Sequence, residues 1–263
     1  MGGSAVQTIF TASMAPTGAG SSRLSAVSPD ETAGYFTDFY SQTLPVVGDG
    51  TIAIEAAPCG VVKISNDGAA GTPFDNGIAT TQCIPLVVGA NTTNIAVVSI
   101  RAKAGTFSGG GFGQSFFGFC DVHGDADSAT SPMGVFRILN QNRTPILNTS
   151  ITVEGGGDTL ALISAPDGWS HTAFHIYTIT ASLVQESTNA VANPAYYDVA
   201  FTFYIDGIKV SRRVQPVYDD GGGYTGYEGT SMSVAAGNRE YNSFSSGIPD
   251  TYVDCISLGS IRA

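Results

Sequence analysis

The hydrophobic and polar positions along this chain alternate with a period of two residues. Short apolar runs recur between clusters of Gly, Pro, Asn, Asp and Ser, and no segment sustains the 3.6-residue period of an amphipathic helix. The runs that we expect to be strands are TIAIEA, VVKIS, NIAVVSIRAK, QSFFGFCD, GVFRIL, DTLALIS, TAFHIYTITASLV, FTFYIDGIKVSRRV and TYVDCISLGSI. This succession predicts an all-β protein, folded as a two-sheet antiparallel β-sandwich.

The most regular segment predicts a β-hairpin. Residues 199–205 alternate in polarity, and Asp206-Gly207 follows, a dipeptide favoured in two-residue hairpin turns because both positions need φ above zero. Asp206 is therefore interpreted as a turn former. A two-residue loop predicts the pairs Ile205–Ile208, Tyr204–Lys209, Phe203–Val210 and Thr202–Ser211. The apolar face is expected to hold Phe201, Phe203, Ile205, Ile208 and Val210. The opposite face, free to meet solvent, a second layer or a partner, is expected to hold Thr202, Tyr204, Lys209, Ser211 and Arg213.

The chain divides into two unequal parts. Residues 1–33 are small, rich in Ser, Ala and Gly, and weakly patterned, which predicts an extended N-terminal arm or a first edge strand. No convincing linker follows, and sandwiches of this length are common as single domains. Residues 34–263 are therefore expected to form one β-sandwich domain.

Three segments carry a resemblance to a known superfamily. They are DGWSHTAFHIYTI (Asp167–Ile179), FTFYIDGIKV (Phe201–Val210) and YVDCISLGSI (Tyr252–Ile261). In this order they resemble strands of the concanavalin A-like lectin/glucanase superfamily, including its laminin-G-like members and the non-catalytic kind found in bacteriophage virion proteins. The resemblance implies a jelly-roll sandwich, but a fold does not by itself define a function.

Charge and hydropathy exclude some classes of partner. The 263 residues carry a formal net charge of −11, and the only basic residue before Lys63 is Arg23. Direct nucleic-acid binding needs clustered cations and is not expected. The N-terminus lacks the basic and apolar regions of a signal peptide, and no run reaches the ~18 apolar residues of a membrane helix. We therefore expect no membrane association.

No catalytic motif is evident in the sequence. The resemblance implies that an active glucanase would carry a Glu-x-Asp-x-x-Glu-like strand, and this chain has none; Glu154 lies beside three glycines and indicates a turn. Neither a Gly-x-Ser-x-Gly elbow nor a His-Glu-x-x-His motif occurs, and the glycine-rich segment 107–114 is interpreted as a hairpin turn. His171 and His175 share one strand face and are interpreted as ordinary strand residues. The sequence thus predicts no enzymatic activity.

One loop offers weak metal ligands. Asp121, Asp125 and Asp127 lie close together, and calcium prefers clustered oxygen ligands. Their spacing does not match an EF-hand, so an exposed polar loop without a cofactor is the favoured interpretation, and calcium is the alternative.

The cysteines do not form a recognisable metal or redox motif. All four are widely spaced, without a Cys-x-x-Cys pair. Cys120 and Cys255 lie in apolar runs and are expected to be free thiols. A Cys59–Cys83 disulfide is the less favoured alternative.

Two surfaces are candidates for binding a partner. The first is the glycine-rich loop 216–231 with Tyr218, Tyr224 and Tyr227, because tyrosine supplies contact area and a hydroxyl at small entropic cost. The second is the polar sheet face near Tyr204 and Lys209.

These features lead to one leading functional hypothesis and two alternatives. The leading hypothesis is a non-enzymatic bacteriophage virion protein, a capsid decoration (cement) or fibre component assembled in the host cytoplasm. It would bind other virion proteins and copies of itself as a homo-oligomer. The first alternative is a carbohydrate-binding, lectin-like module whose partner is a glycan, and the second is a glycoside hydrolase.

Overall fold

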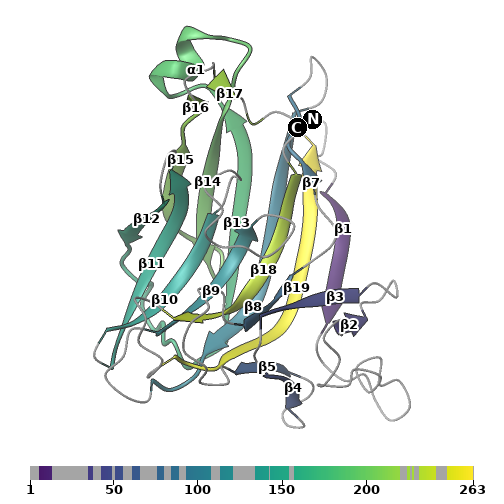
Figure 1. Cartoon of the computed structure of the whole chain (residues 1–263), viewed down its shortest axis with the longest axis vertical. Helices are drawn as coiled ribbons and strands as arrows, with labels where there is room; N and C mark the ends of the chain where they lie inside the picture. The colour runs from purple at the N-terminus through teal and green to yellow at the C-terminus, as the bar shows by residue number, and fades with distance from the viewer. Residues whose placement is uncertain are drawn as a thin grey trace.

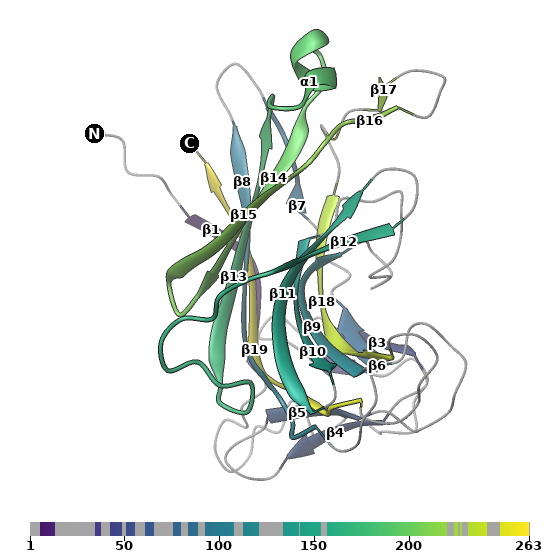
Figure 2. The same ribbon diagram turned by 90° about the vertical axis from the view of Figure 1, so that its left-hand side faces the viewer.

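The structure is a computed structural model. It describes residues 6–13, 35–37, 43–48, 51–55, 61–65, 76–79, 84–88, 93–107, 113–120, 134–141, 143–153, 157–219, 224–225, 227, 231–240 and 248–262. These residues form two antiparallel sheets that face each other as two layers (Figure 2).

The first layer is an eight-stranded sheet. Its strand order is β15-β14-β13-β8-β19-β5-β4, and β1 pairs with β19 beside this path. The strands in this order are β15 (Ile208–Gln215), β14 (Asp198–Ile205), β13 (His175–Val184), β8 (Asn94–Ala104), β19 (Thr251–Arg262), β5 (Val61–Ser65), β4 (Thr51–Glu55) and β1 (Val6–Ser13).

The second layer is a nine-stranded sheet with the order β12-β11-β10-β9-β18-β6-β3-β2, to which β7 adds beside β18. The strands are β12 (Gly157–Leu162), β11 (Thr144–Val153), β10 (Gly134–Gln141), β9 (Gly113–Cys120), β18 (Ser231–Glu240), β6 (Asn76–Ala79), β3 (Thr43–Gly48), β2 (Tyr35–Thr37) and β7 (Ile84–Pro85). The predicted all-β, two-sheet antiparallel jelly-roll sandwich is confirmed.

Small elements lie beyond the strand ends. Helix α1 (Thr188–Ala192) and the short β16 (Tyr218–Asp219) and β17 (Tyr224–Thr225) lie together at one end of the molecule (Figure 1). This helix has five residues, and none of the described residues form a helix that is long and apolar enough to cross a membrane.

The core fills the space between the two sheets. Every second residue of β8 and β13 is buried, as expected for strands with one face turned inward. Aromatic rings from both layers meet there: Phe117 of β9 stacks on Tyr177 of β13, with 4.9 Å between ring centroids. Phe136 of β10 meets Phe203 of β14 edge to face at 5.2 Å. These contacts join the two layers directly.

The N-terminal segment contributes one strand to the first sheet. Strand β1 runs antiparallel to β19, with Val6 opposite Ile261 and Ser13 opposite Cys255. The first and last strands of the chain therefore pair in one sheet (Figure 1). The division of the chain at residue 33 remains a prediction.

The hairpin of β14 and β15 has the predicted turn but not the predicted register. Asp206 and Gly207 both have positive φ, 50° and 82°, as a type I′ turn requires. The next pair, Tyr204 opposite Lys209, is also as predicted, but Phe203 then pairs with Ser211. Val210 is thus an extra residue on β15, a β-bulge that shifts every later pair by one position.

The bulge reverses the faces predicted for β15. A one-residue shift moves each following side chain to the other side of the strand. Arg213 therefore lies opposite the buried Phe201, and its Nη1 donates to the carbonyl oxygens of Thr149, at 2.9 Å, and Thr159. The prediction that Arg213 lies on the same face as Tyr204 and Lys209 is wrong, because the residue points inward and links β15 to the opposite sheet. Ile208, predicted to be buried, is 56% exposed at the tip of the hairpin.

Replacing Arg213 by Met should lower the free energy of unfolding by about 2 kcal/mol, because the carbonyl groups of Thr149 and Thr159 lose a charged donor. The adjacent Arg212 is the matched control, since it lies on the outer face and forms an exposed ion pair with Glu186. Arg212→Met should have a much smaller effect. Urea unfolding of both variants measures the difference, and equal losses would contradict the assigned register.

Candidate functional site

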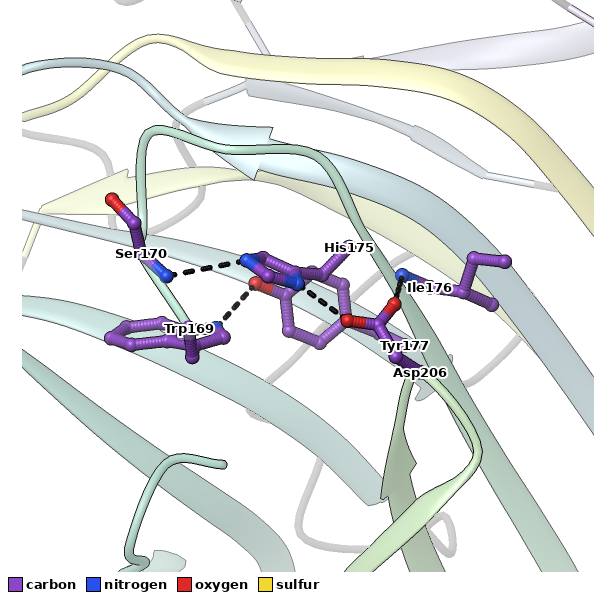
Figure 3. A network of polar contacts seen from close by, with 6 residues as sticks. All are labelled: Trp169, Ser170, His175, Ile176, Tyr177 and Asp206. Carbon is purple, nitrogen blue, oxygen red and sulfur yellow. Dashed lines mark hydrogen bonds and ion pairs between the residues drawn. The ribbon is translucent and has the colours of Figure 1, made fainter. Parts of the chain in front are cut away.

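The first polar cluster joins the loop before β13 to the turn after β14. The loop residues 163–174 run from the second sheet to the first, and within them the Trp169 indole Nε1 donates to the Tyr177 hydroxyl at 3.2 Å. Burial raises the pKa of this hydroxyl, so Tyr177 stays neutral. Figure 3 shows these side chains beside the ring of His175 and the carboxylate of Asp206.

Both ring nitrogens of His175 are engaged. Nδ1 lies 2.6 Å from Asp206 Oδ2, and Nε2 accepts the backbone N–H of Ser170 at 3.2 Å (Figure 3). This pattern places the ring proton on Nδ1. The other carboxylate oxygen of Asp206 accepts the backbone N–H of Ile176 at 2.8 Å. Burial raises the pKa of Asp206, but the bonds from Ile176 and His175 outweigh it and hold the pKa below its ordinary value.

The arrangement of Asp206, His175 and Ser170 is that of a clamp and not of a nucleophilic triad. A triad needs the free ring nitrogen to accept the serine hydroxyl proton. Here His175 Nε2 accepts a hydrogen bond from the backbone N–H of Ser170. The Ser170 hydroxyl lies instead 3.1 Å from the Thr172 hydroxyl. The cluster therefore ties the loop 163–174 to the β14–β15 turn. The prediction of a turn-forming Asp206 is correct, but no sequence pattern indicates its side-chain contacts with His175 and Ile176.

Asp206→Asn should lower the free energy of unfolding by about 1–2 kcal/mol, although Asn-Gly forms a type I′ turn as well as Asp-Gly does. The amide lacks the charge that stabilises the Nδ1 proton of His175. Trp169 is the only tryptophan, so its fluorescence reports this loop directly. We expect its emission to shift to longer wavelength at lower denaturant concentration than in the parent. An unchanged unfolding curve would show that the clamp contributes nothing.

The second cluster lies on the outer face of the eight-stranded sheet. Lys63 of β5 pairs with Tyr252 of β19, and Tyr252 pairs with Lys103 of β8. Phe174 directly precedes β13, the neighbour of β8, and its ring lies beside Lys103. All four side chains are half-buried. They form a line across four strands in which cation and ring alternate, and we call it the cation–aromatic row: Lys63, Tyr252, Lys103 and Phe174.

The rings hold the cations in place. The Lys103 ammonium lies 4.8 Å from the ring centroid of Tyr252 and 5.0 Å from that of Phe174. The Arg101 guanidinium lies 4.7 Å from the Phe174 ring, and the Lys63 ammonium 6.0 Å from the Tyr252 ring. Such contacts are attractive and restrict the long side chains to few conformations. The row is therefore ordered before any ligand arrives.

Two carboxylates flank the row. Lys63 forms an ion pair with Asp250 at 3.1 Å, and Arg101 forms one with Asp254. Lys103, between the two rings, forms no ion pair with any of the described residues. The row thus combines aromatic surface, donors and acceptors within one half-exposed patch.

The predicted binding residues are distributed over several places. Tyr204 and Lys209 form a cross-strand pair on the same outer face as the row, but near the β14–β15 turn. Tyr218 and Tyr224 lie in the β16–β17 ladder, where only the backbone is described. Tyr227 is 6% exposed, and its hydroxyl accepts from Gln215 at 3.0 Å, so it packs in the core.

The predicted metal ligands lie outside the described residues, as do the side chains of Cys59, Cys83 and Cys120. The loop concerned is that of Asp121, Asp125 and Asp127. No group of three potential metal ligands occurs among the described residues. Cys255 is a free, half-buried thiol, and burial raises its pKa.

The prediction that His171 and His175 share a strand face is wrong, because β13 begins at His175 and His171 lies in the loop before it. His171 stacks on Phe107, with 4.8 Å between ring centroids, and burial lowers its pKa. His175 belongs to the clamp with Asp206.

The middle of the nine-stranded sheet is devoid of acidic residues. Strands β9, β10 and β11 contain no Asp or Glu, and in the rest of that sheet's described strands these occur only at Asp158 and Glu240. Retaining glycosidases hold two carboxyl groups about 5–5.5 Å apart. Neighbouring positions on these three strands provide no such pair.

Comparison with solved structures supports the β-sandwich fold. No family model matches the chain, and no curated protein sequence matches it. The chain is similar to the endo-1,3-beta-glucanase from Streptomyces sioyaensis, with a TM-score of 0.56 and 12% identity over 97% of this chain and 96% of that one. It is also similar to the CBM2 module of the evolved Dit of Lactobacillus casei BL23 phage J-1, with a TM-score of 0.53 and 11% identity over 99% and 98%.

A third similar structure is that of the alginate lyase Aly36B, a mutant in complex with alginate trisaccharide. Its TM-score is 0.54, with 12% identity over 97% of this chain and 98% of that one. These likenesses establish a jelly-roll sandwich consistent with the concanavalin A-like fold.

The prediction that the chain is not an enzyme is wrong as an inference from this fold. A glucanase and an alginate lyase share the fold over nearly their whole length. The absence of the Glu-x-Asp-x-x-Glu-like strand argues against one catalytic arrangement and not against enzymes of this fold as a class. At such low sequence identity the likeness shows the fold and does not assign an activity.

Proposed function

We propose that the chain is a carbohydrate-binding protein of a bacteriophage particle, and that it binds polysaccharide through the cation–aromatic row. The observation that carries the proposal is the row itself. Two rings and two ammonium groups stand half-exposed in one line across four strands. Ligand sites combine aromatic surface with a few well-placed polar groups, and this row has both.

The geometry of the row suits an extended ligand. Neighbouring strands are about 4.8 Å apart, so four side chains in one line span three such intervals, about 14 Å. The surrounding strands supply short hydroxyl side chains, such as Ser99 and Thr178, whose oxygens lie 2.8 Å apart. A flat surface of this kind leaves room for a chain of sugar rings lying across the strands.

The phage part of the proposal rests on two further observations. The chain is sparsely charged, with 13% charged residues and 33 glycines, a composition that fits a β-protein assembled among other subunits. The similar phage module belongs to a Dit, and its name designates it a CBM2 module. A decoration or fibre protein, present as a homo-oligomer and contacting other virion subunits, would carry the row on the particle surface. Mass spectrometry of purified particles tests this location.

Affinity electrophoresis in gels containing single polysaccharides tests the binding function. We expect at least one polysaccharide to retard the chain. Tyr252→Ala and Phe174→Ala should each weaken that retardation by about tenfold, since aromatic anchors dominate such contacts. Val191, 65% exposed on helix α1 far from the row, provides the control variant Val191→Ala.

Two results would refute the proposal. One is the absence of retardation across the panel. The other is retardation that Tyr252→Ala and Phe174→Ala leave unchanged, which would place the sugar elsewhere. Assay of the same polysaccharides for newly released reducing ends tests hydrolysis by the bound protein.

A further inference from the structure

We infer that the cation–aromatic row selects acidic polysaccharides, whose repeating carboxylate or sulfate groups pair with Lys103 and its neighbours. The inference rests on the proposed function and names the class of ligand. It starts from the distribution of charge. The whole chain has 11 basic and 22 acidic residues, yet the outer face of the eight-stranded sheet collects many of the basic ones. Those on this face are Lys63, Arg101, Lys103, Lys209 and Arg212.

Fewer acidic residues than basic ones are described on this face. Lys63 pairs with Asp250, Arg101 with Asp254 and Arg212 with Glu186, and the register of β4 and β5 places Glu55 on the same face as Lys63. Lys103 and Lys209 have no ion-pair partner in the described part of the chain. The described part of this face therefore carries a small excess of positive charge on a molecule whose overall charge is strongly negative.

Lys103 is the best placed of these cations. Its ammonium lies between two rings at 4.8 and 5.0 Å from their centroids, so its position is fixed without a carboxylate. An ammonium group has three donors, and the ring faces leave these free to turn toward an incoming anion. A neutral sugar would form only hydrogen bonds with the Lys103 ammonium, whereas an acidic sugar would also form an ion pair with it.

The flanking ion pairs do not block the row. The side chains of Lys63 and Asp250 are 29% and 34% exposed, and that of Arg101 is 43% exposed. The side chain of Asp254 is 18% exposed, so both pairs are partly open to solvent, which screens them and keeps their contribution to stability modest. A ligand carboxylate can therefore share Lys63 or Arg101 with its aspartate at small cost.

The net charge of −11 does not prevent binding of an anion here. At physiological ionic strength the Debye length is about 8 Å, so charges further from the row are largely screened. The local groups then decide the sign of the interaction. Overall repulsion should slow association at low salt without removing the local preference.

The test compares sodium alginate, which carries carboxylates, with laminarin, which is neutral, using the full chain in affinity electrophoresis. We expect alginate to bind more tightly than laminarin. Lys103→Gln should weaken alginate binding by about tenfold and laminarin binding much less, because it removes a charge-assisted contact. Lys209→Gln, the same change on the same face but beside Tyr204, is the matched control and should have little effect.

The outcomes separate this inference from the proposed function. Laminarin binding that depends on Tyr252 and Phe174, with no preference for alginate, would overturn the acidic class and leave the proposed function standing. Binding of neither polysaccharide, nor of any in the panel, would overturn both. Alginate binding that Lys209→Gln weakens and Lys103→Gln does not would also overturn the inference. Circular dichroism of each variant verifies that the fold is unchanged.

Discussion

Gly118→Ala should lower the free energy of unfolding by about 3 kcal/mol or more, because an added methyl group there meets backbone atoms that cannot move away. A Cβ atom on Gly118 would lie 2.4 Å from the carbonyl oxygen of Gly134 and 2.7 Å from Ile179 Cδ1. The first of these is a backbone atom in the β9–β10 pair and cannot rotate away. The φ of 155° at Gly118 adds strain for any residue with a side chain.

Gly168 provides the control for this substitution. It also has a positive φ, 80°, but a Cβ atom there would have no neighbour within 4 Å. Gly168→Ala should therefore cost only the backbone strain, about 1 kcal/mol. Urea unfolding followed by Trp169 fluorescence compares the two variants. Equal losses would mean that close approach of β9 and β10 does not limit the residue at position 118.

Asp198→Asn should lower the free energy of unfolding by about 3 kcal/mol, because the carboxylate accepts four hydrogen bonds at a buried position. Oδ1 accepts the Ser187 hydroxyl at 2.6 Å and the Val217 N–H at 2.8 Å. Oδ2 accepts the backbone N–H groups of Glu186 and Ser187 at 2.9 and 2.7 Å. An amide must place its NH₂ group against one of these pairs of donors, so at least one pair loses its acceptor. Ser187→Ala, which removes only the hydroxyl contacts, should cost less.

Ionisation of Asp198 should make the free energy of unfolding depend on pH. Burial raises the pKa of Asp198, but the hydrogen bonds from Ser187, Glu186 and Val217 outweigh it, and the pKa falls below its ordinary value of 3.8. A lowered pKa gives stability that is complete above 3.8 and is lost as the pH falls through the lower, folded value. The difference in the free energy of unfolding between the parent and Asp198→Asn should therefore be smaller at about pH 3 than at about pH 7. A difference independent of pH would show that ionisation of Asp198 does not contribute.

The fold could be predicted from local patterns, because strand alternation and turn residues are encoded in adjacent positions. The turn at Asp206-Gly207 is an example: two residues determine its φ values, and the structure has them. The bulge at Val210 could not be predicted in this way. It depends on which partner Phe203 finds across the hairpin. The alternation of apolar and polar residues in β15 favours the register without the bulge, because that register places Val210 and Val214 on the inner face.

The candidate site was missed for a related reason. The site combines residues from four distant parts of the chain, Lys63, Lys103, Phe174 and Tyr252. Phe174 and Tyr252 lie in segments whose resemblance indicates a fold, and no binding motif includes any of the four. They become neighbours only through the pairing of β5, β19 and β8 and the position of the residue before β13. The local composition of the loop 216–231, in contrast, predicts a binding surface, but Tyr227 of this loop is a core residue. Composition is enough to predict loops, whereas predicting which residues share one face of a sheet requires the strand register.

The most direct test of carbohydrate binding on this face is backbone amide chemical-shift mapping by NMR during titration with oligosaccharides from the polysaccharide that retards the chain. The proposed function predicts that the shifted amides cluster on β5, β8, β19 and the start of β13, around Lys63, Lys103, Phe174 and Tyr252. Shifts confined to the nine-stranded sheet, or no shifts at saturating oligosaccharide, would contradict it.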